Sequence, residues 1–175
     1  MTEKYVMSES RIPDGILHDQ ALYSAFLVDN VLTLSFETHF YPQNYTDTTF
    51  AQKYKDFTRC HIKCRLEDEY FCNAELKTSF NKKNMYRVKS ISIAEFVDLV
   101  NSEIDKAKEG EYKSCEYLHT YVSPNINEAV IELSVYVKYE GVKYSMCNLE
   151  LNTKEIEFIW EWQKGAEFCT LLGCR

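Results

Sequence analysis

The amino-acid sequence predicts an α+β fold: an antiparallel β-sheet of about seven to nine strands, curved or partly closed, packed with one main amphipathic helix at about residues 92–109. Three observations predict it. Apolar and polar residues alternate along several stretches, which is the period of a half-buried strand. Residues that favour tight turns separate pairs of these stretches, as in hairpins. Only one stretch repeats its apolar residues with the period of a helix.

Length and composition favour a single globular domain over residues 1–175. Of the 175 residues, 45% are hydrophobic and 27% are charged, which are ordinary values for a folded domain. Asp and Glu number 27 against 20 Lys and Arg, for a net charge of -7, which argues against a nucleic-acid partner. Residues 1–15 lack the apolar core of a signal peptide, and no run approaches the ~20 apolar residues that cross a bilayer. We therefore expect a cytoplasmic protein with no membrane contact.

The first hairpin is predicted over residues 21–38. Its turn falls at Asp29-Asn30, because both residue types tolerate the left-handed backbone of a two-residue turn. The resulting register makes one face apolar, with four pairs: Val28 with Val31, Leu27 with Leu32, Ala25 with Leu34, and Tyr23 with Phe36.

Alternation over residues 57–80 predicts a second hairpin around a three-residue loop, Glu67-Asp68-Glu69, with Cys64 facing Cys72. Residues 40–55 are typical of a surface loop, and residues 85–90 can add a short strand.

The helix is predicted to begin after Ser92, which forms a capping box with Glu95, and to stop at Gly110. Its buried stripe consists of Ile93, Phe96, Val97, Val100 and Ile104, with Leu99 at the margin.

The last third of the chain predicts further strands. Residues 112–122 alternate, and residues 129–151 form a third hairpin that turns at Glu140-Gly141 and pairs Val135 with Met146. A bulge near Cys147-Asn148 would restore the apolar phase beyond that point. Residues 152–164 are compatible with a helix or a strand, and their aromatic and β-branched residues favour a strand. Residues 165–175 form a short helix or a frayed end.

The seven cysteines are interpreted as thiols of a reducing cytosol, mostly buried. A zinc site built from Cys60, Cys64 and Cys72 is disfavoured, because Cys60 and Cys64 lie roughly 13 Å apart along a strand and His61 points to the other face. We therefore expect no metal and no cofactor.

No catalytic motif stands out. The pair His18-Asp19 matches a metal phosphohydrolase motif in two residues only, and capping of a turn explains it as well. The sequence has no nucleophile elbow and no glycine-rich phosphate loop. No catalytic residue is assigned, and an enzyme would need a cleft that gathers His61, His119 or clustered carboxylates.

Charge is unevenly placed along the chain. Residues 53–89 hold ten basic and five acidic residues. They include a row on one strand face, which is a solvated surface or a contact surface for an acidic ligand: Arg59, His61, Lys63 and Arg65. The candidate residues for binding a protein partner are the helix's outer acids, a second acidic stretch and two tryptophans: Glu95, Asp98, Glu103, Asp105, Glu155, Glu157, Glu161, Trp160 and Trp162.

Residues 17–36 read Leu-His-Asp, a strand, Asp-Asn and then Val-Leu-Thr-Leu-Ser-Phe. This stretch resembles the opening of several families of small bacterial cytosolic proteins of immunity or unassigned function. The resemblance implies a binding role in which the protein blocks a cognate toxin, and it assigns no functional residue.

The leading hypothesis is therefore a non-catalytic bacterial binding protein, an immunity-type inhibitor whose partner is a protein, such as a basic toxin domain. The first alternative is a small-molecule binder with an apolar cavity in the curved sheet. The second is an enzyme of unrecognised type. The sequence predicts no particular oligomeric state.

Overall fold

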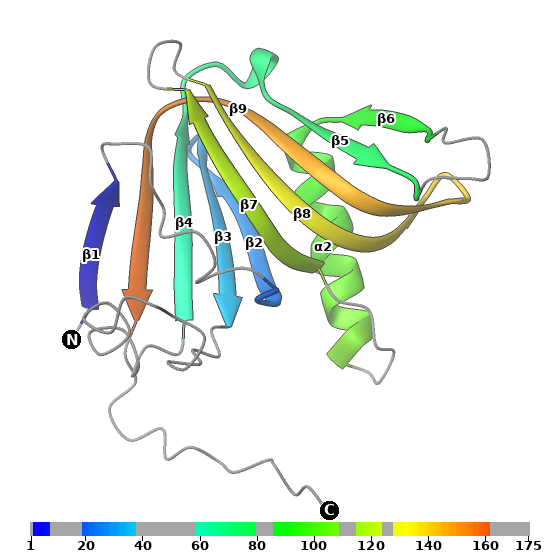
Figure 1. Cartoon of the computed structure of the whole chain (residues 1–175), viewed down its shortest axis with the longest axis horizontal. Coiled ribbons are helices and arrows are strands. Elements are labelled where there is room, and N and C mark those ends of the chain that lie inside the picture. The colour runs from blue at the N-terminus through cyan, green and yellow to red at the C-terminus, as the bar shows by residue number, and fades with distance from the viewer. Residues whose placement is uncertain are drawn as a thin grey trace, which may run out of the picture.

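The computed structural model describes residues 2–7, 19–37, 59–79, 86–108, 115–123 and 128–161. These residues form a nine-stranded sheet, one α-helix and one short 3-10 helix, η2 (Figure 1). The bounds, in chain order, are β1 (Thr2–Met7), β2 (Leu22–Val28), β3 (Val31–Glu37), β4 (Arg59–Leu66), η2 (Glu69–Phe71), β5 (Asn73–Lys77), β6 (Val88–Ile91), α2 (Ile93–Lys108), β7 (Cys115–Ser123), β8 (Glu128–Tyr139) and β9 (Val142–Glu161).

The antiparallel sheet bends into two halves that share β9 (Figure 1). In the first half, β2, β3, β4, the second part of β9 and β1 pair in that order. In the second half, β7, β8, the first part of β9, β5 and β6 pair in that order. The sheet is not closed, although an isolated bridge from Ala21 to Glu116 connects the β2 edge of the first half with the β7 edge of the second. The predicted fold class, a curved antiparallel sheet with one main helix, is confirmed.

The inner faces of both halves enclose one hydrophobic core. It forms because alternate residues of each strand are apolar and point inward. The largest fully buried side chains come from both halves and from the helix: Phe36, Phe96, Leu32, Leu34, Ile62, Leu76, Ile131, Leu133 and Leu149.

Helix α2 follows the predicted pattern. The hydroxyl of Ser92 accepts a hydrogen bond from the Glu95 backbone N–H at 3.2 Å, and the Glu95 carboxylate accepts one from the Ser92 backbone N–H at 2.9 Å, which is a capping box. All five residues of the predicted stripe are buried, and Leu99 is half-buried.

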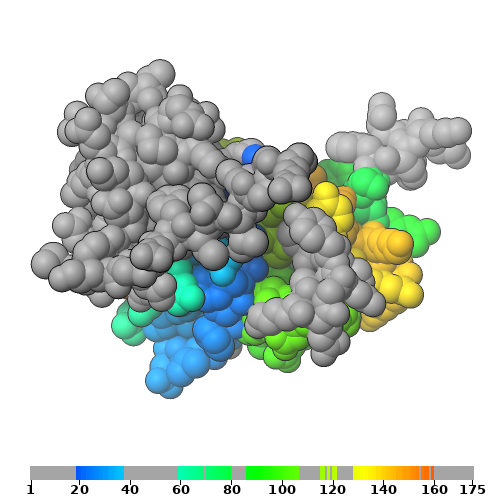
Figure 2. All heavy atoms as spheres, turned by 90° about the horizontal axis from the view of Figure 1, so that it is seen from below, coloured from blue at the N-terminus to red at the C-terminus, as the bar shows by residue number. Residues whose placement is uncertain are grey.

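The helix packs beside β2, the end strand of the first half (Figure 2). There the Asn101 amide oxygen accepts a hydrogen bond from the Ala25 backbone N–H at 3.0 Å, and the amide nitrogen donates to the Ala25 carbonyl at 2.7 Å. One side chain thus satisfies two backbone groups that the edge of a sheet would otherwise leave unpaired.

The turns of two predicted hairpins, at residues 29–30 and 140–141, are confirmed. Asp29 and Asn30 adopt φ of 51° and 58°, and the pairs of Val28, Leu27 and Ala25 are as predicted. The pairing of Tyr23 with Phe36 is wrong, because the register shifts between Leu22 and Ser24 and places Leu22 opposite Phe36.

The hairpin of β8 and β9 turns at Glu140-Gly141, as predicted, and contains a bulge. Met146 pairs with Ser134 rather than with Val135, because two residues of β8 between Ser134 and Val137 lie opposite one residue of β9. The buried residues keep alternating along β8, whereas on β9 the buried phase shifts between Tyr144 and Cys147, just before the predicted position at Cys147-Asn148.

The second predicted hairpin is wrong, because β4 and β5 do not pair with each other. Both pair with β9, which places Cys64 opposite Ile156 and Leu76 opposite Cys147. Alternation specifies which face of a strand is buried but not which strand lies next to it.

Residues 152–161 are a strand, as favoured, and continue β9. The predicted short strand is present as β6. The predicted loop at 40–55, the tail at 165–175 and Trp162 lie outside the described residues.

Candidate functional site

The predicted basic row lies on the outer face of the first half of the sheet. Arg59, His61 and Lys63 are half-buried and Arg65 is exposed, whereas the residues between them point into the core. The prediction that these four side chains share one outward face is therefore confirmed.

Part of the predicted acidic set lies beside this row. Lys63 is directly opposite Glu157 on β9, and Arg59 is opposite Glu161 on β9 and Glu37 on β3. From the sequence, the basic row and the acidic stretch at residues 155–161 were expected to be separate candidate surfaces. Because β4 and β9 are neighbours in the sheet, the two lie on one surface. We call this surface the mixed-charge face; its side chains are Arg59, His61, Lys63 and Arg65 of β4 with Glu155 and Glu157 of β9.

At one end of the mixed-charge face, His61 and Arg59 contact side chains of β2 and β3. The Ser35 hydroxyl lies 2.8 Å from Nδ1 of His61. Tyr23 meets the His61 ring edge-on with centroids 6.4 Å apart, and Arg59 stacks 5.1 Å from the Tyr23 ring centroid. A histidine within hydrogen-bonding distance of a serine hydroxyl can activate that serine as a nucleophile. Ser35, however, is 3% exposed, so a substrate has little access to its hydroxyl.

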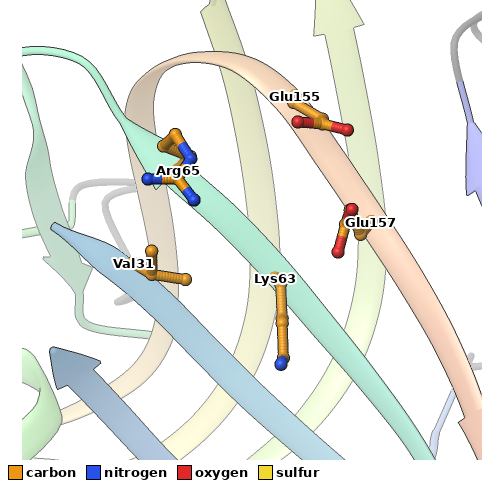
Figure 3. Close-up of a pocket in the computed structure, with 5 residues that line it drawn as sticks. All are labelled: Val31, Lys63, Arg65, Glu155 and Glu157. Carbon is orange, nitrogen blue, oxygen red and sulfur yellow. The ribbon is translucent and has the colours of Figure 1, made fainter. Parts of the chain in front are cut away.

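A hollow of about 240 Å³ opens at the other end of the mixed-charge face. Two bases from β4, two carboxylates from β9 and one apolar side chain from β3 surround it (Figure 3): Lys63, Arg65, Glu155, Glu157 and Val31. The lining of the hollow is basic on the β4 side and acidic on the β9 side.

β9 has a bulge beside the hollow. Cys64 pairs with Ile156 and Leu66 with Thr153, so two residues of β9 lie opposite Arg65 alone. The buried Thr153 hydroxyl lies 2.8 Å from the Arg65 carbonyl oxygen and 2.9 Å from the Glu155 carbonyl oxygen. It ties the bulge to both strands.

The outer face of the second half holds a cluster that the sequence reasoning missed. Glu75, Asn148 and Glu132 lie side by side on β5, β9 and β8, and Glu150 lies two residues beyond Asn148. Lys77 lies 3.5 Å from Glu75, and His119 of β7 is opposite Glu132 in the sheet. Exposed Tyr121 and Met146 lie on the flanking rows of this face. We call Glu75, Glu132, Glu150, Tyr121 and Met146 the acidic face.

The acidic residues predicted on the helix belong to α2, which lies far from the second part of β9 (Figure 1). Glu95, Asp98 and Asp105 are exposed as expected. The Ser92 backbone N–H and hydroxyl donate to the Glu95 carboxylate and hold its pKa below the usual value.

The expectation for Glu103 is wrong, because it is only 7% exposed and pairs with Lys106 at 2.7 Å. It lies seven residues after Phe96 and three after Val100, which places it on the buried stripe. Nothing is described of the side chains of Trp160 and Glu161.

The described cysteines do not form a reactive or metal-binding centre. All five are free and buried: Cys60, Cys64, Cys72, Cys115 and Cys147. Burial raises the pKa of Cys64 to about 12 and also raises that of Cys60, so thiolate is scarce near neutral pH. Among the described residues, no group of three or more His, Cys, Asp or Glu side chains could hold a metal ion.

Comparisons with protein families, with curated proteins and with solved structures found no match for this chain. In the described part of the chain, no helix has the length and apolar character needed to cross a membrane.

Proposed function

We propose that the protein is a non-catalytic binding protein of the immunity type, which inhibits a cognate basic protein toxin. The acidic face is the single observation that carries this proposal. Three glutamates from three adjacent strands lie together, and Lys77 is 3.5 Å from one of them. Such a surface attracts a basic protein and speeds its association.

The apolar side chains on the same face support a protein partner. Tyr121 is 54% exposed and Met146 is 38% exposed. Tyrosine and methionine are enriched at the centres of protein interfaces, where they supply contact area that charge alone does not. The net charge of -7 has the sign that a basic toxin requires. The resemblance of residues 17–36 to immunity-type proteins agrees with this role.

The alternative of an apolar cavity has less support. The largest side chains of the described core are less than 2% exposed, so the inner face offers little space for a ligand beside them.

The test begins with the partner. The full chain is used to capture proteins from its native cell, and a captured basic protein is then expressed alone and together with the chain. We expect the partner alone to arrest growth and the chain to restore it. A captured partner that does not arrest growth, or whose arrest the chain does not relieve, would overturn the proposal.

Two variants with the same charge change then locate the contact. Glu150→Lys alters the acidic face, and Asp98→Lys alters the exposed side of α2. We expect Glu150→Lys to lower the association rate constant and its salt dependence, with little change for Asp98→Lys. A larger effect of Asp98→Lys would move the contact to the helix and overturn the assignment to the acidic face.

A further inference from the structure

We propose that Tyr70 and Phe71 are the apolar anchors of the contact with a basic protein partner, and that they insert into a cleft with an apolar floor and a rim of Arg and Lys side chains. The partner is the toxin of the proposed function, on which this inference therefore rests. Both residues belong to η2, between β4 and β5 and close to the bend of β9 (Figure 1). We call them the aromatic pair.

The aromatic pair forms the most exposed apolar patch of the described residues. Tyr70 is 88% exposed and Phe71 is 64% exposed, more than any other large hydrophobic side chain in this part of the chain. The two rings pack edge to face, with centroids 5.4 Å apart and an angle of 90° between their planes. They therefore present one patch rather than two separate side chains. An exposed apolar patch with a polar rim is typical of a binding surface.

Asp68 holds the backbone of the aromatic pair. Its carboxylate accepts a hydrogen bond from the Tyr70 backbone N–H at 2.9 Å, and its backbone carbonyl accepts one from the Phe71 backbone N–H at 3.1 Å. A side chain that bonds the backbone two residues later is a common way to fix a turn. The two rings therefore start from a defined backbone.

The residues on either side of η2 fix it to the sheet. Leu66 and Cys72 are buried. The Asn152 backbone carbonyl of β9 accepts a hydrogen bond from the Glu67 backbone N–H at 2.9 Å, and the Asn152 backbone N–H donates to the Cys72 sulfur at 3.1 Å. The loop that carries the aromatic pair is thus ordered before it meets a partner, which lowers the entropy cost of binding.

The charges around the aromatic pair favour a basic partner. Residues 66–76, between Arg65 and Lys77, contain four acidic residues and no base. Exposed Asp68 directly precedes η2. Asn73 follows η2 and lies opposite Glu150 of the acidic face, so the patch adjoins that face.

A basic cleft meets both requirements of this surface. Its Arg and Lys rim complements the acidic surroundings, and an arginine side chain can also stack on an exposed ring. Aromatic residues are enriched at the centres of interfaces, where a few of them supply most of the binding energy. A second copy of this chain fits less well, because its net charge of -7 would bring like charges together.

Site-specific photo-cross-linking of the full chain in its native cell tests the contact. p-Benzoyl-L-phenylalanine replaces Phe71 in one version, and in the matched control it replaces Phe26, which is 54% exposed on β2. We expect the probe at Phe71 to give one dominant product, whose partner peptide contains Arg or Lys beside apolar residues by mass spectrometry. The proposal fails if the product joins two copies of the chain, appears equally with the probe at Phe26, contains an acidic partner peptide, or does not form.

Alanine variants then measure the anchors against the purified cross-linked protein. We expect Tyr70→Ala and Phe71→Ala each to raise the Kd by at least about ten-fold, mainly through faster dissociation, and Phe26→Ala to change it by less than about two-fold. Urea denaturation should show the same stability for the parent chain and for Tyr70→Ala, because the side chain that is removed is exposed. Unchanged affinity for both variants of the aromatic pair would overturn the proposal.

Two outcomes separate the anchors from the inhibition of a toxin. If the cross-linked protein binds through the aromatic pair but does not arrest growth, the inhibition fails and the anchors remain. If it arrests growth, is relieved by the chain and binds Tyr70→Ala and Phe71→Ala as tightly as the parent chain, the inhibition remains and the anchors fail.

Discussion

The buried thiols show how burial sets the chemistry of single residues. Cys60, Cys64, Cys115 and Cys147 lie in the core, and burial raises the pKa of each thiol. Removal from water disfavours the charged thiolate, so the protonated form persists where an exposed cysteine would ionise. These residues act as small hydrophobic side chains rather than as nucleophiles.

This shift predicts an alkaline limit to stability. The folded pKa of Cys64 is about 12, above the value of 9.0 for an exposed thiol. Only the unfolded chain loses this proton as the pH rises above 9, so the stabilising contribution is complete below pH 9 and decreases towards pH 12. We expect the free energy of unfolding, measured with urea, to fall over that range.

The variant Cys64→Ala isolates the effect. It lowers stability at neutral pH because it leaves a cavity, but its stability should decline less steeply above pH 9 than that of the parent chain. Parallel declines for the two proteins would contradict the assignment to Cys64.

At the level of secondary-structure elements, one side chain of α2 binds the edge of the sheet. Asn101 bonds both backbone groups of Ala25. We expect Asn101→Leu to lower the free energy of unfolding by about 1–3 kcal/mol, because it leaves a part-buried N–H and C=O without partners. Urea denaturation measures this change.

The neighbouring variant Ser102→Ala is the control for Asn101. Ser102 is exposed on the same helix, so its replacement should change the free energy of unfolding by less than about 0.5 kcal/mol. Equal losses for the two variants would mean that the contact with β2 does not stabilise the fold.

Elements defined by short stretches of sequence, and hairpins between consecutive strands, were predictable; pairings between strands far apart in the sequence were not. The capping box at Ser92, the turn at Asp29-Asn30 and the outward row of β4 each depend on neighbouring residues. The pairing of β4 with β9 depends on residues about 90 to 100 positions apart, for which alternation contains no signal. The bulge opposite Arg65 could not be predicted for the same reason.

Whether a candidate surface could be predicted also depended on how far apart its residues lie in the sequence. The basic row was predictable because it lies on one strand. The acidic face was not, because Glu75, Glu132 and Glu150 come from three strands that are distant in sequence and meet only in the sheet. The opposition of Lys63 and Glu157 likewise appears only when β9 takes its place beside β4.

On the scale of the whole molecule, one core joins both halves of the sheet. Ile62 belongs to the first half and Leu149 to the second, and both are fully buried. We expect Ile62→Ala and Leu149→Ala each to lower the free energy of unfolding by about 2–5 kcal/mol. Each should also reduce amide protection against hydrogen exchange in both halves, because the halves unfold together. A loss of protection confined to the half that carries the substitution would contradict a shared core.

The bulge in β9 also affects how many residues this corner of the chain needs. Leu151 and Thr153 point inward before it, and Ile156 points inward after it, although Thr153 and Ile156 are three positions apart. Deleting Lys154 would remove the extra residue and make the alternation regular, so Ile156 would still point inward and Glu157 outward. The corner can therefore lose one residue without exchanging the two faces of the strand.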